Sequence, residues 1–238
     1  MEGREERVNR QNSMKYEAVI FDLGGTLVHN SYWSEGDNAL RRMASVLAVP
    51  PDDFVTSWHA TFEERMTGIF QSYQACIRHI CQQLGVDVQD DQIESAARIR
   101  SDYTKREITT TQEGAIEVLS YLKLNGYKTG LISDCSAETP TIWKSTPLAP
   151  LINVAVFSCE VGLKKPDPRI YQIAIEKLAI SPEKCIYIAD GIGQELLSAS
   201  QLGMYAIQIR VPGEYDDPYR EEWSGPVISS LKDVLTLV

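Results

Sequence analysis

The sequence predicts an α/β protein with a Rossmann-like parallel sheet core, helices on both faces of the sheet, and an additional all-helical cap domain. Short apolar runs rich in Val and Ile alternate along most of the chain with amphipathic helical segments. This alternation is typical of buried parallel strands joined by crossover helices. Residues 29–110 break the alternation, because they carry several helical patterns and no convincing strand.

Each predicted strand is a short apolar run of the kind that a parallel sheet buries on both faces. Five such runs are expected, at Tyr16–Phe21, Lys128–Ile132, Asn153–Ser158, Cys185–Ala189 and Met204–Ile209. The helical region lies between the first run and the second. It is therefore an insertion into the sheet domain directly after the first strand.

The helices between the strands carry an apolar stripe and recognisable end signals. Residues 115–122 repeat apolar side chains at i, i+3, i+4 and i+7, and Gly126 stands where a C-terminal capping glycine belongs. Residues 170–178 repeat the pattern. Asp167 is expected as the N-cap of that second helix, with Pro168 in its first turn.

The inserted region shows similar helical stripes at residues 40–47 and 73–84. Asp52 is expected to cap the helix that follows Pro50, and Asp90 or Asp91 to begin the last helix of the region. The expected organisation is a disordered tail of residues 1–14, an α/β core of residues 15–28 and 111–238, and a helical cap of residues 29–110.

Composition limits the classes of partner. The chain has 238 residues, 43% of them hydrophobic, and a formal net charge of −10. This balance argues against nucleic acid or an anionic membrane as a partner, because both require a basic face. A small anionic substrate remains compatible with it. Apolar runs are too short to cross a bilayer, and the polar start of the chain does not resemble a signal peptide.

The five cysteines are odd in number and scattered, as in cytoplasmic proteins without a disulfide framework. We therefore expect a cytoplasmic protein. Both a monomer and a homodimer are compatible with the sequence.

Polar side chains follow the predicted strands where the sheet ends. Asp22 follows the first strand, Ser133 the second and Asp190 the fourth, while the third is followed by a segment that contains Lys165. Glu195 stands five residues after Asp190. Ligands of an open parallel sheet bind beyond the carboxyl ends of its strands, so these groups are expected at one site.

This combination suits phosphoryl transfer assisted by a hard cation. Mg²⁺ takes oxygen ligands and commonly binds through one or two carboxylates and a substrate phosphate. A carboxylate beside the metal can attack phosphorus and form an aspartyl-phosphate. A lysine, a serine hydroxyl and the backbone amides around Gly24 and Gly25 can stabilise the charge on the transferred group.

The segments "FDLGGTL", "LIS", "GLKKPDP" and "ADGIGQE" resemble, in order and spacing, the four motifs of the haloacid dehalogenase-like hydrolases. The helical insertion falls where that family carries its cap. The resemblance implies Asp22 as the nucleophile, and Ser133 and Lys165 as the groups that bind and neutralise the phosphoryl group. Gly24, Gly25 and Asp134 are the further expected substrate-binding residues. Mg²⁺ is the implied cofactor, and its implied ligands are Asp22, the Gly24 carbonyl, Asp190 and Glu195.

One departure from the family pattern affects the reaction. Phosphatases of the family usually carry an aspartate two residues after the nucleophile, where it protonates the leaving group, and this chain has Gly24. A substrate with a good leaving group or a donor from elsewhere would compensate. His29, Asp134 and Glu160 are the candidate donors.

The resulting hypothesis is a Mg²⁺-dependent phosphatase acting on a small phosphorylated metabolite. One alternative is a catalytically quiet protein that keeps the fold and binds a ligand or serves regulation. Another is a metal-free 2-haloacid dehalogenase, since halide leaves without a proton; the acidic pair Asp190 and Glu195 argues against it. Trp33, Trp58 and Phe62 are candidates for the pocket entrance, although burial in the core of the cap is the alternative.

Overall fold

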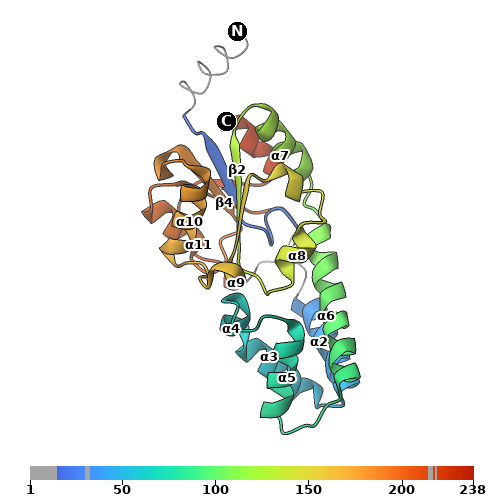
Figure 1. The fold of residues 1–238 in the computed structure, drawn as a ribbon. Coiled ribbons are helices and arrows are strands. Elements are labelled where there is room, and N and C mark those ends of the chain that lie inside the picture. Colours follow the sequence, from blue (N-terminus) through green and yellow to red (C-terminus); the bar gives the residue numbers. More distant parts are fainter. Residues whose placement is uncertain (1–14, 30–32, 214–216, 218) are drawn as a thin grey trace.

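The computed structural model describes residues 15–29, 33–213, 217 and 219–238. The expected tail of residues 1–14 lies outside this range. The described chain forms a layered α/β body, with a group of helices at one end of it (Figure 1).

The centre of the body is a six-stranded parallel sheet in the order β3-β2-β1-β4-β5-β6. The strands are β1 (Ala18–Phe21), β2 (Lys128–Ser133), β3 (Val154–Phe157), β4 (Cys185–Ala189), β5 (Tyr205–Ile209) and β6 (Val227–Ile228). The first five confirm the predicted runs. The sixth was not predicted, because its two residues form too short a run to stand out and are held by pairing with β5.

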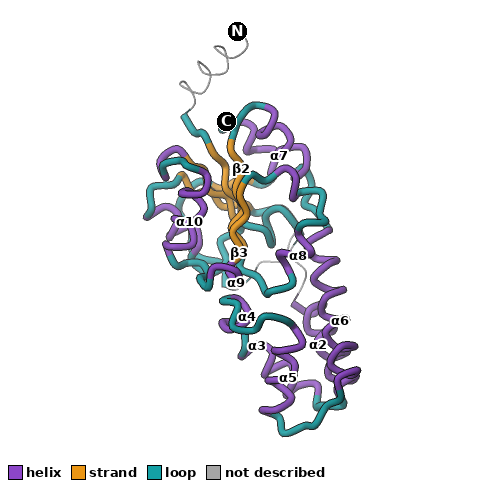
Figure 2. Tube along the Cα trace, viewed as in Figure 1, coloured by secondary structure: helices purple, strands orange, loops and turns teal. Residues whose placement is uncertain are grey.

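Helices cover both faces of the sheet (Figure 2). On one face lie α7 (Ala115–Leu124) and the 3₁₀ helix η3 (Leu231–Thr236); on the other lie α10 (Pro168–Leu178) and α11 (Glu195–Gln201). Side chains of β1 point alternately to the two faces of the sheet. Val19 packs in the hydrophobic core under α7 and η3, and Ile20 packs in the core under α10 and α11. The predicted α/β class is therefore confirmed.

Predicted helix ends are also found. The Asp167 side chain accepts a hydrogen bond from the Arg169 amide at 2.9 Å, and Pro168 is the first residue of α10. Gly126 follows the end of α7 with a φ of 84°. The shorter helices at the rim of the sheet are α8 (Thr139–Trp143), η1 (Ala149–Leu151), α9 (Ser158–Val161) and η2 (Pro182–Lys184).

The described part of the inserted region consists of helices joined by turns and short loops, and it has a hydrophobic core of its own. Its helices are α2 (Trp33–Leu47), α3 (Pro51–Ala60), α4 (Phe62–Met66), α5 (Tyr73–Gln83) and α6 (Asp90–Thr109). The expectation that Asp52 caps α3 is wrong. Pro50 takes the N-cap position and Pro51 begins the helix, because its fixed φ suits the first helical turn. Asp52 instead pairs with Arg41 at 2.7 Å.

The two connections between the inserted helices and the sheet run side by side. The His29 amide donates to the Thr110 carbonyl at 3.2 Å, and the Gln112 amide donates to the Leu27 carbonyl at 2.9 Å. We propose on this basis that residues 29–110 form a cap domain on a core of residues 15–28 and 111–238. The two linkers then form a short paired hinge between them.

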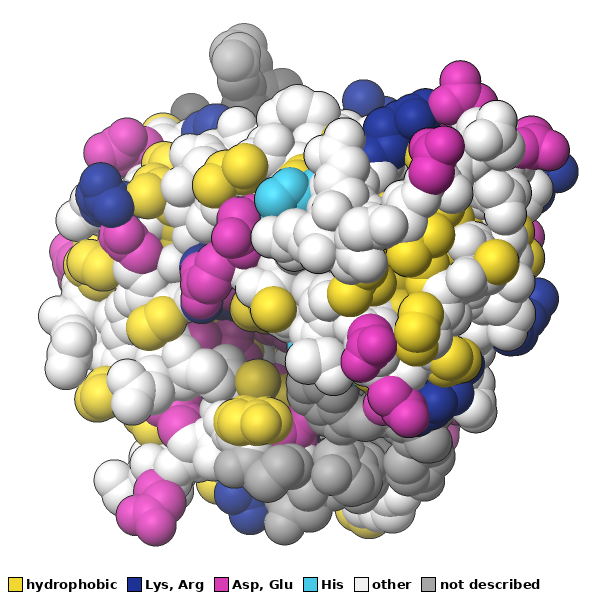
Figure 3. Space-filling model, turned by 90° about the horizontal axis from the view of Figure 1, so that it is seen from below, with side chains coloured by type: hydrophobic (Ala, Val, Ile, Leu, Met, Phe, Trp, Pro, Cys, Tyr) yellow, Lys and Arg dark blue, Asp and Glu magenta, His cyan; other side chains and the backbone are white. Residues whose placement is uncertain are grey.

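None of the helices in these ranges combines the length and apolar character that a membrane span requires. Figure 3 views the molecule from the end at which the inserted helices lie, and on this face acidic and basic side chains are interspersed.

Candidate active site

The site lies at the carboxyl ends of β1 and β4, the two neighbouring strands at the centre of the sheet. From β1 the chain first builds one side of the sheet with β2 and β3, and then crosses to the other side with β4. Such a reversal of strand order opens a crevice that binds ligands. Asp22 directly follows β1 and Asp190 directly follows β4, and the Asp22 amide donates to the Ile188 carbonyl at 2.9 Å.

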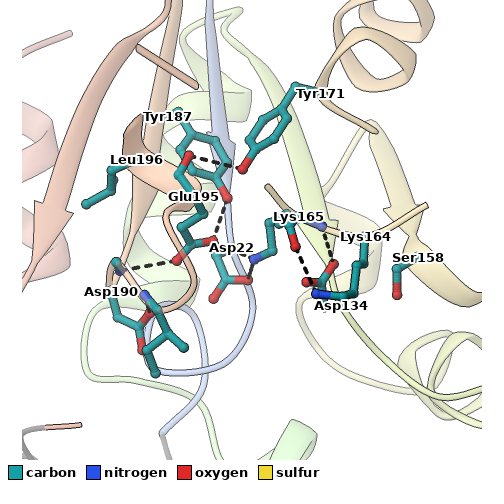
Figure 4. A network of polar contacts seen from close by, with 12 residues as sticks. Asp22, Asp134, Ser158, Lys164, Lys165, Tyr171, Tyr187, Asp190, Glu195 and Leu196 are labelled. Atoms are coloured by element: carbon teal, nitrogen blue, oxygen red, sulfur yellow. Dashed lines mark hydrogen bonds and ion pairs between the residues drawn. The ribbon is translucent and has the colours of Figure 1, made fainter. Parts of the chain in front are cut away.

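Lys165 lies at the centre of the polar network at this edge of the sheet (Figure 4). Its ammonium donates to Asp22 Oδ1 and, at 2.5 Å, to Glu195 Oε2. Its backbone amide donates to Asp134 Oδ1 at 3.0 Å. Burial disfavours the charged ammonium, but the carboxylates of Asp22, Glu195 and Asp134 outweigh burial and raise the pKa of Lys165 well above its usual range. The lysine is therefore a fixed positive charge at the predicted nucleophile.

Three buried carboxylates surround this lysine. Asp22, Asp190 and Glu195 are 6%, 2% and 1% exposed, and each offers one oxygen within 4.8 Å of the others. Burial raises the pKa of Asp22 to about 6. The charge of Lys165 opposes this increase, and the charge of Glu195 adds to it. Burial, with the charges of Glu195 and Asp22, raises the pKa of Asp190 well above its usual value. One ammonium does not balance three carboxylates, and a buried cluster of oxygen donors fits a hard divalent cation.

Three protein groups donate hydrogen bonds to the Glu195 carboxylate. Its Oε1 accepts from the Gly191 amide at 3.1 Å, and its Oε2 accepts from the Tyr187 hydroxyl at 2.9 Å as well as from Lys165. The Tyr171 hydroxyl donates to the Glu195 backbone carbonyl at 3.0 Å. Both oxygens of the Glu195 carboxylate are therefore engaged before any ligand binds.

Sequence reasoning did not identify Tyr171 and Tyr187 as site residues. Tyr187 lies in the middle of β4 and Tyr171 on the apolar face of α10, so both match the pattern of core residues. Their rings meet edge to face with centroids 5.3 Å apart. A hydroxyl within an otherwise apolar strand was the available signal, because a buried tyrosine needs a hydrogen-bond partner.

The glycines after Asp22 shape the turn at the end of β1. Gly25 is buried and has a φ of 67°, a conformation that favours glycine. Gly24 forms a bridge with Val28, and the Leu27 amide donates to the Leu23 carbonyl at 2.9 Å. The chain thus curls back tightly beside the Asp22 carboxylate before it leaves for the inserted helices.

Ser133 and Asp134 reach the same edge from β2. Ser133 is the last residue of the strand and is 4% exposed. Asp134 is part of the polar network through the Lys165 amide, and burial raises the pKa of Asp134 against the opposing effect of Lys165. Of the three candidate proton donors, Asp134 lies in the network, whereas His29 and Glu160 are exposed.

The neighbouring lysine has a different role. Lys164 Nζ pairs with Glu63 Oε1 of α4 at 3.2 Å and lies 5.7 Å from the centre of the Phe62 ring. Lys165 is therefore the lysine that contacts Asp22 and Glu195, while Lys164 contacts the inserted helices. Trp58 is 2% exposed in the core of those helices and Phe62 is 46% exposed; the side chain of Trp33 lies outside the described part.

Curated relatives cover different shares of the chain. A region of 100 residues, 39% of this chain and 38% of the relative, is 35% identical to the Rhythmically expressed gene 2 protein of Drosophila melanogaster. The chain thus spans well under half the length of that relative. A glyceraldehyde 3-phosphate phosphatase of Pyrococcus furiosus is 25% identical over 231 residues, which cover 94% of this chain and 93% of the relative.

Solved structures with the same fold include a dehalogenase and a magnesium complex. The dehalogenase has a TM-score of 0.62 at 21% identity and covers 94% of this chain and 97% of its own. A haloacid dehalogenase family enzyme of Bacteroides thetaiotaomicron, solved as a magnesium complex, has a TM-score of 0.63 at 18% identity and covers 88% and 97%. At these identities the likeness shows the fold alone.

The family follows from a broader match. The family model described as haloacid dehalogenase-like hydrolase matches residues 16–203, which run from just before β1 to just past α11. The matched range contains the whole network around Lys165. This chain belongs to the haloacid dehalogenase-like hydrolases.

Proposed function

We propose that the protein is a Mg²⁺-dependent phosphatase that hydrolyses a small phosphorylated metabolite through an aspartyl-phosphate. The observation that carries the proposal is the contact of Lys165 with Asp22 and Glu195, beside Asp190, in one buried cluster. The glyceraldehyde 3-phosphate phosphatase name of a relative that matches over nearly the full chain supports the same reaction class.

Asp22 is the proposed nucleophile. One of its carboxylate oxygens attacks phosphorus, and the bond from phosphorus to the leaving oxygen breaks with its electron pair on that oxygen, which then takes up a proton. Water next attacks the aspartyl-phosphate, releases inorganic phosphate and restores the Asp22 carboxylate. Lys165 stabilises this charge transfer, because its ammonium already lies against Asp22 Oδ1 and needs no reorganisation.

The proposed direct metal ligands are Asp22, Asp190 and the carbonyl of Gly24. A bound Mg²⁺ would supply positive charge to the phosphoryl oxygens of the substrate. Glu195 has both oxygens engaged by protein donors. We therefore propose that Glu195 contacts the metal through water and that its main role is to position the Lys165 ammonium.

The proposed substrate is a small organic phosphate rather than a nucleic acid or a membrane lipid. The net charge of −10 supports this choice, because polyanions require a broad basic surface. The five free cysteines support a cytoplasmic location for the enzyme.

An activity assay tests the proposal against both alternatives. We expect the purified protein to hydrolyse an activated aryl phosphate with Mg²⁺ and to lose this activity in EDTA. Asp22→Asn should abolish turnover while the protein remains folded by circular dichroism, because an amide is a very poor nucleophile. Release of halide from a 2-haloacid in EDTA would instead establish a dehalogenase. Inactivity toward both substrates, with Mg²⁺ binding retained, would establish a catalytically quiet protein.

A further inference from the structure

Two cysteine sulfurs lie in contact at the edge of the sheet that carries the site. Cys135 Sγ and Cys159 Sγ are 3.8 Å apart, although the residues are separated by 24 positions in the sequence. Cys135 lies in the loop after β2, directly after Asp134, and Cys159 lies in α9 after β3. Both thiols are free in this structure.

The backbone around the pair is already fixed. The Cys135 amide donates to Ser158 Oγ at 2.9 Å, and the Ser158 hydroxyl lies 3.4 Å from the Cys135 carbonyl. Ser158 is fully buried, so this pair of contacts holds the β2 loop against the start of α9. The two thiols therefore meet between segments whose relative position is set by other groups.

The two thiols differ in access and in acidity. Cys135 is 7% exposed, whereas Cys159 is only partly buried. The contact with the Cys135 thiol lowers the pKa of Cys159, against the opposing effect of burial. Burial, with that same contact, raises the pKa of Cys135 well above its usual value. Cys159 is thus the more reactive thiol and Cys135 is placed to resolve it.

We propose that Cys135 and Cys159 form a reversible disulfide modification site whose oxidant is a hydroperoxide. The Cys159 thiolate attacks one oxygen of hydrogen peroxide, becomes a sulfenic acid and, with one proton taken up, releases water. The Cys135 thiol then attacks the Cys159 sulfur, a second water leaves, and the disulfide forms. In sum two thiols and one peroxide give one disulfide and two waters, and the protein loses two electrons and two protons.

Formation of this bond joins the loop after β2, which begins at Asp134, to α9. A disulfide requires sulfurs about 2.05 Å apart, so the two sulfurs have to approach from their present 3.8 Å. Asp134, the neighbour of Cys135, accepts the Lys165 amide hydrogen bond, and Ser133 is the next residue back. Any movement of the Cys135 backbone as the bond forms therefore acts on the groups around Lys165.

The cysteine pair also lies against the inserted helices, through the backbone of Cys159. A Cβ on Gly68, which lies between α4 and α5, would come within 2.0 Å of the Cys159 carbonyl oxygen. This part of the cap therefore rests on the Cys159 backbone with no spare room. We expect a new bond at Cys159 to disturb this close packing, and oxidation is therefore expected to lower catalytic turnover. This consequence rests on the proposed phosphatase activity, whereas formation of the disulfide does not.

The test is peroxide treatment of the full-length protein, followed by alkylation and peptide mapping by mass spectrometry. We expect a peptide pair linked through Cys135 and Cys159, reversed by dithiothreitol, while Cys76, Cys81 and Cys185, which are 0% exposed, remain alkylatable only after unfolding. Cys159→Ser and Cys135→Ala should each abolish the linked peptide. Cys81→Ser is the matched control that should leave it intact. Under the same treatment we expect aryl phosphatase activity to fall by roughly 10- to 100-fold and to return with dithiothreitol.

Each outcome decides one part of the inference. Oxidised protein in which Cys135 and Cys159 remain thiols, or in which each is found only as an irreversible acid, overturns the modification site. A linked peptide with unchanged aryl phosphatase activity overturns the effect on turnover and leaves the site. A protein without phosphatase activity, reduced or oxidised, contradicts the proposed function, and the peptide map still decides the disulfide.

Discussion

At the scale of single residues, Gly24 distinguishes this site from that of the usual phosphatase of its family. The turn after Asp22 still offers a backbone carbonyl for a metal and backbone amides for a phosphate. It has no side chain at position 24, where the family's proton donor is expected. General acid catalysis typically contributes 10²–10⁴-fold. A site without it depends on the leaving group, unless Asp134 supplies the proton.

The first prediction follows from this dependence. Rates of the wild-type protein should fall steeply as the pKa of the leaving group rises, because an unprotonated alkoxide must carry the developing charge. Gly24→Asp should flatten the series, accelerating alkyl phosphates and leaving aryl phosphates nearly unchanged. The residue with positive φ in this turn is Gly25, so a side chain at position 24 does not meet that strain. The measurement is kcat/KM for a graded series of aryl and alkyl phosphates; a flat wild-type series would show that another residue already donates the proton.

A second prediction concerns the hydroxyl behind Glu195. Tyr187→Phe removes the donor at 2.9 Å from Glu195 Oε2 and should lower kcat by about 10-fold, the effect of one lost hydrogen bond to a charged group. KM should change less, since Lys165 rather than Tyr187 meets the substrate. Tyr171→Phe is the matched control, because its hydroxyl bonds the Glu195 backbone and not the carboxylate. Equal losses in both variants would point to a packing effect rather than to positioning of Glu195.

At the scale of secondary-structure elements, the inserted helices are joined to the sheet by contacts besides their hinge. The Tyr73 hydroxyl at the start of α5 lies 2.9 Å from Ser136 Oγ in the β2 loop and 2.7 Å from Thr104 Oγ1 of α6. The Tyr73 amide donates to the carboxylate of Glu138. Together with the pair Lys164 and Glu63, these contacts hold the helices over the carboxyl edge of the sheet.

The third prediction tests this junction with two glycines of similar conformation. Gly68 has a φ of 72° and Gly85 a φ of 68°, so replacement of either by alanine costs about 1–2 kcal/mol of backbone strain. Only Gly68 also has a neighbour in the way, the Cys159 carbonyl, whereas a Cβ on Gly85 meets nothing within 4 Å. Gly68→Ala should therefore lower the free energy of unfolding in urea by more than Gly85→Ala does. It alone should also raise KM, and equal KM values in both variants would contradict a junction that shapes the substrate site.

At the scale of the whole molecule, the cluster of Asp22, Asp190 and Glu195 lowers the stability of the folded protein when no cation is bound. Three carboxylates and one lysine lie together in one buried cluster, and burial raises the pKa of Asp22 and of Asp190. A cation that binds only the folded chain offsets this cost and raises its stability by mass action.

The fourth prediction is a stabilisation of the whole protein by Mg²⁺. At about 100 times its Kd, Mg²⁺ should raise Tm by on the order of 5–10 °C relative to EDTA, which follows from about 2.7 kcal/mol of binding linkage in a chain of this size. Asp190→Asn should lose most of the shift, while Glu195→Gln should keep more of it if its contact runs through water. The measurement is a thermal melt of each protein with and without Mg²⁺. A shift of the same size in Asp190→Asn would remove that residue from the metal site.

The sequence by itself determined the fold class, five of the six strands and the residues that meet at the carboxyl edge. These features depend on local patterns: apolar runs with a period of two or 3.6, and a polar residue at each strand end. Asp22, Lys165, Asp190 and Glu195 could be predicted as one site because parallel strands bring their carboxyl ends to the same edge. The resemblance in four motifs added the roles of these residues.

Only the tertiary structure decided which groups touch. Tyr187 matches a core residue in the sequence, yet its hydroxyl bonds Glu195, and Cys135 and Cys159 bear no mutual signal across 24 positions. β6 is two residues long and exists through its pairing with β5. Helix α3 begins at Pro51 with Pro50 as its N-cap, and not with Asp52 as the N-cap. The Tyr187 contact, the cysteine pair and β6 have the same physical reason. Each is a contact between separate segments of the chain, which depends on how the sheet and helices pack in space. The pattern within either segment therefore cannot predict it.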